Sequence, residues 1–186
     1  MHPFPVVLVS GASSNHRALV LREGSDAGEF TNQLWGTNLA KAWRAPVLVV
    51  APKTATLPAA DITSLYLPGL LVATVAAAEK LRDPLIEELP ARIEGQPTSV
   101  LNAQFTIHRF REEGSDTLRV PGGAVLLLHA ADFYKQDNPP DVQLFWLHDG
   151  NFPRVLLCTE RFVERVWHAK LSGLTFTHLG CAKTDA

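Results

Sequence analysis

The sequence is poor in several features that would assign it quickly to a class of protein. It contains only two cysteines, Cys158 and Cys181, among 186 residues, which argues against a disulfide-stapled secreted scaffold. No run of about 18 apolar residues occurs, so we expect no membrane-spanning helix. The formal net charge is only −2, so the chain lacks the basic footprint typical of a nucleic-acid-binding protein.

The segment Met1–Pro5 has neither the basic region nor the apolar stretch of a secretory signal. Together with the few cysteines, this predicts a cytoplasmic protein. The hydrophobic content of 46% and the charged content of 19% are ordinary for a soluble globular protein. No low-complexity linker divides the sequence, so we expect a single domain over residues 1–186, with a loose tail at 180–186.

The loop Ser10–His16 suggests two kinds of enzyme. The run from Val6 to Ser14 resembles the opening of a short-chain dehydrogenase, where glycines let the backbone approach a pyrophosphate. Asn15, His16 and Arg17 stand where further glycines would be needed, and this weakens that interpretation.

A serine hydrolase is the other enzyme that this loop permits. Ser10, Ser13 and Ser14 are candidate nucleophiles, and seven histidines are available as bases, but no Gly-x-Ser-x-Gly elbow occurs. A small enzyme that uses the Ser10–His16 loop, either a degenerate nucleotide-binding oxidoreductase or a hydrolase, is therefore the alternative function.

Metal binding is not favoured by the spacing of the histidines, because no pair has the i, i+4 separation of a helical zinc site. The adjacent carboxylates Glu112 and Glu113 point in different directions, as expected of a solvated surface. The sequence predicts no catalytic residue, no metal site and no cofactor.

The most informative pattern is a repeated unit, which consists of an apolar run, a threonine, an amphipathic stretch and a second run. Thr74 and Thr159 align at a shift of 85 residues. The two copies are Leu70–Thr74, Ala76–Glu88 and Leu89–Ile93, followed later by Val155–Thr159, Glu160–Lys170 and Leu171–Phe176. The pattern predicts two strand–helix–strand units. Either an internal duplication or convergent packing explains the similarity.

Within these units, Thr159 suits a helix N-cap and Gly173 a left-handed residue after the helix. The apolar stripe of the second helix is expected to contain Phe162, Val163, Val166, Trp167, Lys170 and Leu171.

Three further segments complete the predicted architecture. The alternation over Ser99–Phe110 predicts one long half-buried strand, and Arg111–Asp116 reads as a charged turn. On the predicted strand Val142–Leu147, Phe145 and Trp146 face opposite sides, so one is exposed or covered by a helix on the second face. We expect an α+β (mixed α/β) fold, a single domain with a mixed sheet and the two strand–helix–strand units.

Several short motifs, taken in their order, resemble a family of bacterial immunity proteins from polymorphic-toxin and contact-dependent competition systems. In the second half they are Leu144–Leu147, Phe152–Phe162 and Leu171–Phe176. In the first half they are Leu34–Gly36, Asp61–Ile62, Pro68–Val72, Leu89–Pro90 and Val100–Asn102. The resemblance covers residues 30–179. Val72–Thr74 and Leu157–Thr159 replace the family's valine-serine pairs, and Thr117–Pro140 matches poorly, so the subfamily is not identified.

The resemblance implies a cytoplasmic immunity protein that is not an enzyme and that neutralises one cognate secreted toxin by direct binding. Neither a nucleic acid nor a membrane is the expected partner. The predicted partner contacts are acidic or aromatic loop positions, namely Glu112, Glu113, Asp137, Asp141, Trp146 and Asp149. An adaptor domain without a toxin partner is a third possibility. The sequence predicts neither the toxin nor the oligomeric state.

Overall fold

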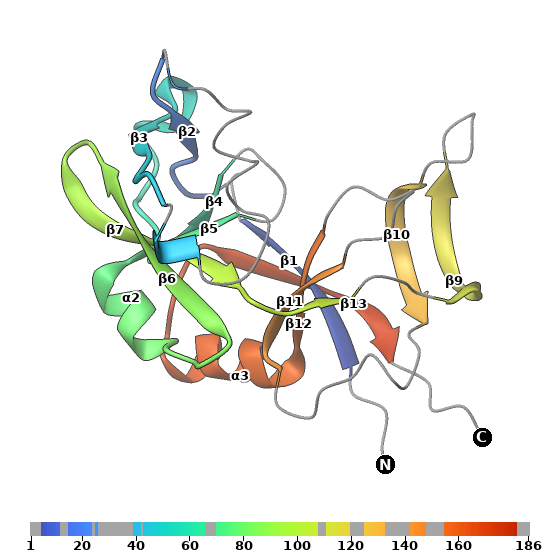
Figure 1. Ribbon diagram of the computed structural model, residues 1–186. Coiled ribbons are helices and arrows are strands. Elements are labelled where there is room, and N and C mark those ends of the chain that lie inside the picture. Colours follow the sequence, from blue (N-terminus) through green and yellow to red (C-terminus); the bar gives the residue numbers. More distant parts are fainter. Residues whose placement is uncertain are drawn as a thin grey trace. The chain divides into compact units, whose positions relative to one another are not determined.

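The computed structural model describes residues 5–11, 15–23, 25, 39–41, 43–65, 70–107, 111–119, 125–132, 142–147 and 155–181 (Figure 1). Mixed β-sheet is combined with two α-helices in these ranges, so the predicted α+β class is confirmed. The chain forms two compact units. The first comprises Met1–Val9, Phe105–Glu164 and Phe176–Ala186, and the second comprises Ser10–Gln104 and Arg165–Thr175.

The first unit is built on a five-stranded sheet with the order β13-β1-β12-β11-β8. These strands are β1 (Pro5–Gly11), β8 (Thr106–Ile107), β11 (Leu144–Leu147), β12 (Val155–Thr159) and β13 (Leu174–Cys181). β12 is antiparallel to both β1 and β11, whereas β8 is parallel to β11. A separate antiparallel pair consists of β9 (Arg111–Arg119) and β10 (Val125–Asp132).

β11 lies inside this sheet, and all four of its residues are buried. Phe145 and Trp146 face opposite sides of the strand, with 1% and 6% of their surfaces exposed, so both faces are covered. The expected exposure of Trp146 is therefore wrong. The sequence of a strand that is covered on both faces is typically a continuous apolar run, and Leu144–Leu147 fits that pattern.

The second unit contains a six-stranded sheet with the order β2-β3-β6-β7-β5-β4. Its strands are β2 (Leu19–Leu21), β3 (Val47–Val50), β4 (Ile62–Ser64), β5 (Leu71–Thr74), β6 (Ile86–Ile93) and β7 (Gln96–Ala103). Two short 3₁₀ turns, η1 (Leu39–Lys41) and η2 (Pro52–Thr54), accompany them. Leu19 on β2 forms an isolated parallel bridge with Leu65, directly after β4, so the sheet curls until its two edges meet.

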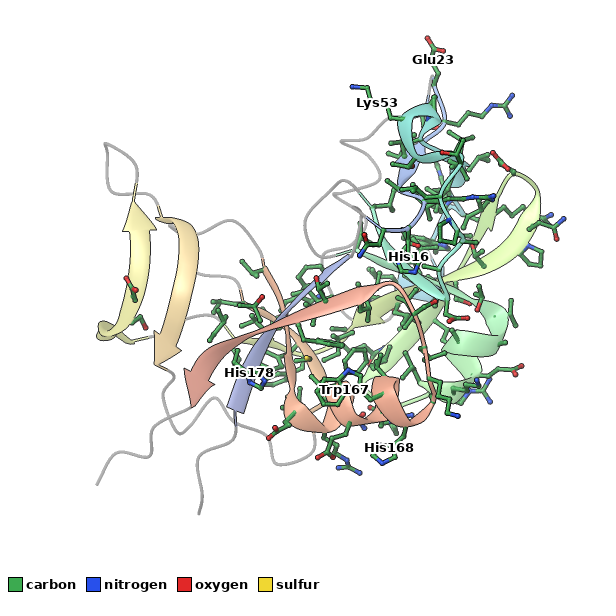
Figure 2. All side chains as sticks on the ribbon, turned by 180° about the vertical axis from the view of Figure 1, so that it is seen from behind. His16, Glu23, Lys53, Trp167, His168 and His178 are labelled. Atoms are coloured by element: carbon green, nitrogen blue, oxygen red, sulfur yellow. The ribbon has the colours of Figure 1, made fainter. Side chains whose placement is uncertain are left out.

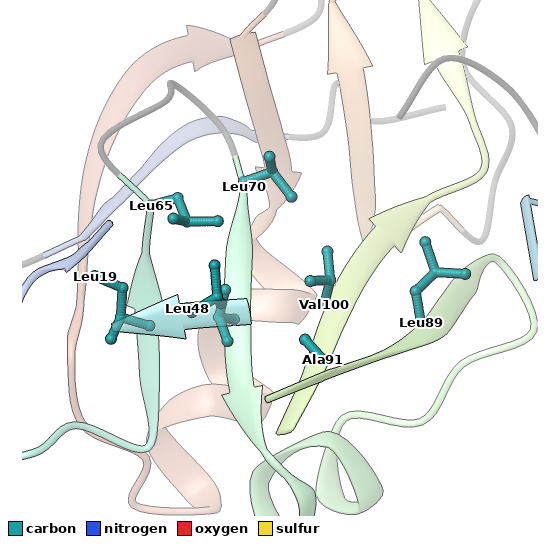
Figure 3. Close-up of a cluster of buried hydrophobic side chains, with 8 residues drawn as sticks. Leu19, Leu48, Leu65, Leu70, Leu89, Ala91 and Val100 are labelled. Carbon is teal, nitrogen blue, oxygen red and sulfur yellow. The ribbon is translucent and has the colours of Figure 1, made fainter. Parts of the chain in front are cut away.

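The concave side of this sheet holds an apolar core (Figure 3). Its buried members come from every strand region of the sheet and are Leu19, Leu48, Leu65, Leu70, Val72, Leu89, Ala91 and Val100. The opposite face of β5 and β7 carries Leu71 and Leu101, which are also buried. The helix α2 (Val75–Lys80) contacts both strands and turns Ala77 and Ala78 inward, which explains this burial.

Both predicted strand–helix–strand units are present, as β5-α2-β6 and as β12, α3 (Glu160–His168) and β13. They also share a strand order, β4-β5-β7-β6 in one sheet and β11-β12-β1-β13 in the other. In each case one further strand separates the two strands of the unit. In the first copy this is β7, which follows β6 through the turn Glu94-Gly95. In the second copy it is β1, from the opposite end of the sequence.

Three boundaries differ from those predicted. α2 ends at Lys80 instead of continuing to Glu88, because Pro84 disfavours helical backbone at Asp83 and β6 already begins at Ile86. The described part of the predicted strand Ser99–Phe110, residues 99–107, is divided between β7 and β8, which belong to different sheets. The predicted charged turn Arg111–Asp116 lies within β9, whose pairing with β10 outweighs its polar composition. Within the described ranges, no helix is long and apolar enough to cross a membrane.

Candidate functional site

The largest exposed apolar side chain among the described residues is Trp167, near the end of α3 (Figure 2). Phe162, Val163 and Val166 form the buried stripe of this helix, whereas Trp167 is 65% exposed. Each helical residue advances by about 100°, so Trp167 lies one step beyond Val166, at the margin of the stripe. The prediction that Trp167 contributes to the buried stripe is therefore wrong.

The end of α3 is fixed by a pair of hydrogen bonds characteristic of the Schellman motif. Leu171 N donates to Val166 O at 3.0 Å, and Lys170 N donates to Trp167 O at 2.9 Å. Lys170 has a φ of 53°, so this lysine occupies the left-handed position that usually belongs to glycine. Gly173, which the sequence placed in that role, follows three residues later with a φ of 100°.

The C-terminal end of α2 is tied to the C-terminal half of α3 by side chains from both helices. The Nη2 of Arg165 donates to Lys80 O at 3.0 Å and to Arg82 O at 3.1 Å, while its Nη1 lies 3.7 Å from Asp83 Oδ2. In return, Lys80 Nζ donates to Ala169 O at 3.4 Å. Each cation thus meets carbonyl oxygens at the negative end of a helix, which is a favourable placement.

We refer to the exposed residues around these helix ends as the α2–α3 corner; they are Lys80, Arg82, Trp167, His168 and Lys170. Glu79 and Glu164 are exposed on the same two helices. The corner therefore presents one large indole among basic side chains, with two carboxylates on the same helices, an arrangement suited to contact with a protein surface.

The segment that follows α3 is anchored to the start of β4. The amide and hydroxyl of Ser172 both donate to Asp61 Oδ2, at 2.9 and 2.7 Å, and Ile62 N donates to Ser172 O at 3.1 Å. These bonds, above all the one from the Ser172 amide, hold the pKa of Asp61 below its usual value. The position of Trp167 thus rests on a helix that is held at its end and just beyond it.

Thr74 and Thr159, which precede α2 and α3, differ in whether their hydroxyl groups cap the helix. Thr74 Oγ1 accepts from Ala77 N at 3.2 Å, as an N-cap does. The hydroxyl of Thr159 is buried and has no hydrogen-bond partner among the described residues, so the predicted cap at this position is wrong.

The predicted partner contacts are only partly within the described residues. Glu112 and Glu113 belong to β9, although their side chains are not among those described. Asp137, Asp141 and Asp149 lie outside the described residues. Trp146 is buried in β11, so the structure does not bring it to the surface. The contact roles of the five acidic residues stay predictions.

The sequence reasoning missed Trp167, which it assigned to the core. A signal was available, because Trp167 has Glu164 three residues before it and Lys170 three residues after it, and side chains at these separations are neighbours on a helix. A residue flanked in this way lies at the polar margin of an amphipathic helix.

The residues proposed for an enzyme are also incompletely described. Ser10 lies on β1 and His16 is half-buried with an unpartnered Nδ1, but Ser13 and Ser14 are outside the described residues. Cys158 is buried in β12, and this burial raises the pKa of its thiol. Compared with known proteins, the chain matches no family model and no curated protein.

Proposed function

We propose that this chain is an immunity protein that binds a cognate secreted toxin through the α2–α3 corner and thereby neutralises it. The resemblance over residues 30–179 supports the class of function. The observation that carries the proposal is the 65% exposure of Trp167. Tryptophan is among the residues most enriched at the energetic centres of protein interfaces.

The surroundings of Trp167 favour a binding role because they hold the helix that presents it. Arg165 binds the end of α2 from the turn of α3 that also carries Trp167, and the Schellman motif begins at Val166. A side chain on such a fixed element loses little conformational freedom when a partner covers it. The indole can therefore act as a rigid anchor for a pocket on the toxin.

The proposal is tested by co-expression in a sensitive bacterium. The domain to express is the C-terminal domain of a large secreted protein, where one is encoded beside this chain. We expect the chain to restore growth and to co-purify with that domain as a stoichiometric complex. A toxin domain from an unrelated system serves as the matched control and should remain toxic. Unrelieved toxicity of the cognate domain, with no complex, would overturn the proposal.

A further inference from the structure

Arg82, which follows the end of α2, presents an oriented guanidinium to the solvent. Its side chain is 72% exposed, and its Nε donates to Glu88 Oε1 at 3.4 Å. Its two terminal amino groups contact no acceptor in the part of the chain that the structure describes. The backbone is held as well, because Arg82 O accepts from Arg165 Nη2 at 3.1 Å. The guanidinium is thus held through Nε, while its terminal N–H groups are available to a partner.

Arg82 is the counterpart of Trp167 in the internal repeat. The shift of 85 residues that aligns Thr74 with Thr159 also aligns these two residues. In both copies, the strand before the helix has antiparallel neighbours on both sides. The buried residues of the helices follow the same shift; they are Ala77, Ala78 and Leu81 in the first copy and Phe162, Val163 and Val166 in the second. Arg82 and Trp167 each directly follow the last of these residues, and both are exposed.

Two lysines add positive charge near Arg82 and Trp167. Lys80 Nζ donates to Ala169 O at 3.4 Å, so its charge meets a neutral acceptor. Lys170, three residues after Trp167, is exposed, and its ammonium contacts no carboxylate within the described ranges. A partner that covers these helix ends would therefore bury uncompensated cations unless it brings carboxylates of its own.

We propose that the toxin surface that covers the α2–α3 corner is acidic and pairs a carboxylate with the guanidinium of Arg82, beside the pocket that receives Trp167. This inference rests on the proposed function and adds the chemistry of the partner. Arginine and tryptophan are both enriched at the energetic centres of interfaces, and here they occupy equivalent positions. A guanidinium and a carboxylate form charge-assisted hydrogen bonds in a fixed geometry, which supplies specificity as well as affinity.

The size and the charge of the corner both favour a different protein over a second copy of this chain. Specific interfaces bury about 800 Å² on each partner, which is enough to include the ends of both helices. A two-fold dimer through the corner would place the same patch on both sides of the interface. The cations Lys80, Arg82 and Lys170 of the two copies would then face one another and repel.

The first test measures the association and dissociation rates of the toxin domain by surface plasmon resonance. Wild-type association should slow by about tenfold from about 50 to about 500 mM NaCl, because salt screens attraction between opposite charges. Arg82→Glu should associate about tenfold more slowly than wild type at the lower salt concentration and keep the wild-type unfolding midpoint. Arg92→Glu is the matched control. Arg92 is exposed on β6, where its Nη1 donates to Gly95 O at 3.4 Å, and its reversal should change association by less than about threefold.

Two milder variants keep the inference testable if Arg82→Glu does not fold. Arg82→Lys retains the charge but not the planar fork, so it should keep the association rate and dissociate about fivefold faster. Glu79→Gln removes an exposed negative charge from α2 and should speed association by about twofold.

The outcomes separate this inference from the proposed function. Unchanged rates in the Arg82 variants, with weaker binding in Trp167→Ala, would overturn the inference and leave the proposed function standing. Faster association of Arg82→Glu, or slower association of Glu79→Gln, would identify a basic toxin surface and also overturn the inference. If the toxin domain does not bind the wild-type chain, both are overturned.

Discussion

Lys80 and Arg165 occupy equivalent positions in the two strand–helix–strand units, and each donates to backbone carbonyls at or just beyond the C-terminal end of the other unit's helix. The shift of 85 residues that aligns Thr74 with Thr159 also aligns these two cations. Arg165 reaches the carbonyls of Lys80 and Arg82, and Lys80 reaches the carbonyl of Ala169. The repeat seen in the sequence thus has a counterpart in the contacts between its helices.

The two cations should contribute unequally to stability. Arg165→Met removes two hydrogen bonds from a largely covered guanidinium and should lower the free energy of unfolding by about 2 kcal/mol. Lys80→Met removes one long bond from an exposed ammonium and should cost less than about 1 kcal/mol. Urea denaturation of both variants and of the double variant measures this. Equal losses would show that the two contacts are not as different as their geometry implies.

Acidification should weaken the anchor between Asp61 and Ser172. The folded-state pKa of Asp61 is depressed, so its stabilising effect is present above the unfolded-state pKa of about 3.9 and is lost as the pH falls through that value toward the folded pKa. Asp61→Asn should therefore be less stable than wild type by about 1 kcal/mol at pH 7, and the difference should shrink below about pH 4. Denaturation at pH 7 and pH 3 measures both. A difference that is constant with pH would assign the loss to something other than the charge.

Gly173 should tolerate substitution much less than Gly95. Both have positive φ, 100° and 88°, but a Cβ on Gly173 would collide with Ile62 O and Ala60 Cβ, whereas a Cβ on Gly95 would meet open space. Gly95→Ala should cost about 1 kcal/mol for its backbone conformation, and Gly173→Ala at least about 2 kcal/mol more. Thermal unfolding of both variants compares them directly. Similar losses would mean that the backbone conformation alone sets the cost.

Replacing Lys170 with glycine should stabilise the protein. Lys170 adopts a left-handed backbone conformation at the position where α3 ends, and this conformation is strained for a residue with a Cβ. Glycine has no Cβ and adopts the same conformation without that strain. Lys170→Gly should raise the free energy of unfolding by about 1 kcal/mol. Lys170→Ala loses the same charge while keeping the Cβ, so it separates the two effects and should not be stabilising. An equal gain in the alanine and glycine variants would point to the charge instead.

The sequence predicted the parts of the fold that follow from local periodicity. The two strand–helix–strand units could be found because each helix buries one stripe and each strand is a short apolar run. The break between β7 and β8 could not, because residues 99–107 alternate smoothly and only the sheets that receive them differ. The extent of α2 was overestimated because the boundary effect of Pro84 was given too little weight.

The candidate site was harder to predict because exposure depends on tertiary neighbours. Trp146 lies on a strand that is covered on both faces, and the continuous apolar run Leu144–Leu147, which is typical of such a strand, was given too little weight. Trp167 directly follows the buried Val166, so the apolar pattern was given more weight than the charged neighbours Glu164 and Lys170.

The most direct test of the proposed binding surface is the Kd of the toxin domain for wild type, Trp167→Ala and Val47→Ala, measured by isothermal titration calorimetry. Val47 is also an exposed apolar residue, on β3, and serves as the matched control. We expect Trp167→Ala to weaken binding by at least about 30-fold and Val47→Ala to change it by less than about twofold. Wild-type affinity in Trp167→Ala, with an unchanged unfolding midpoint, would contradict the assignment of the α2–α3 corner as the toxin-binding surface.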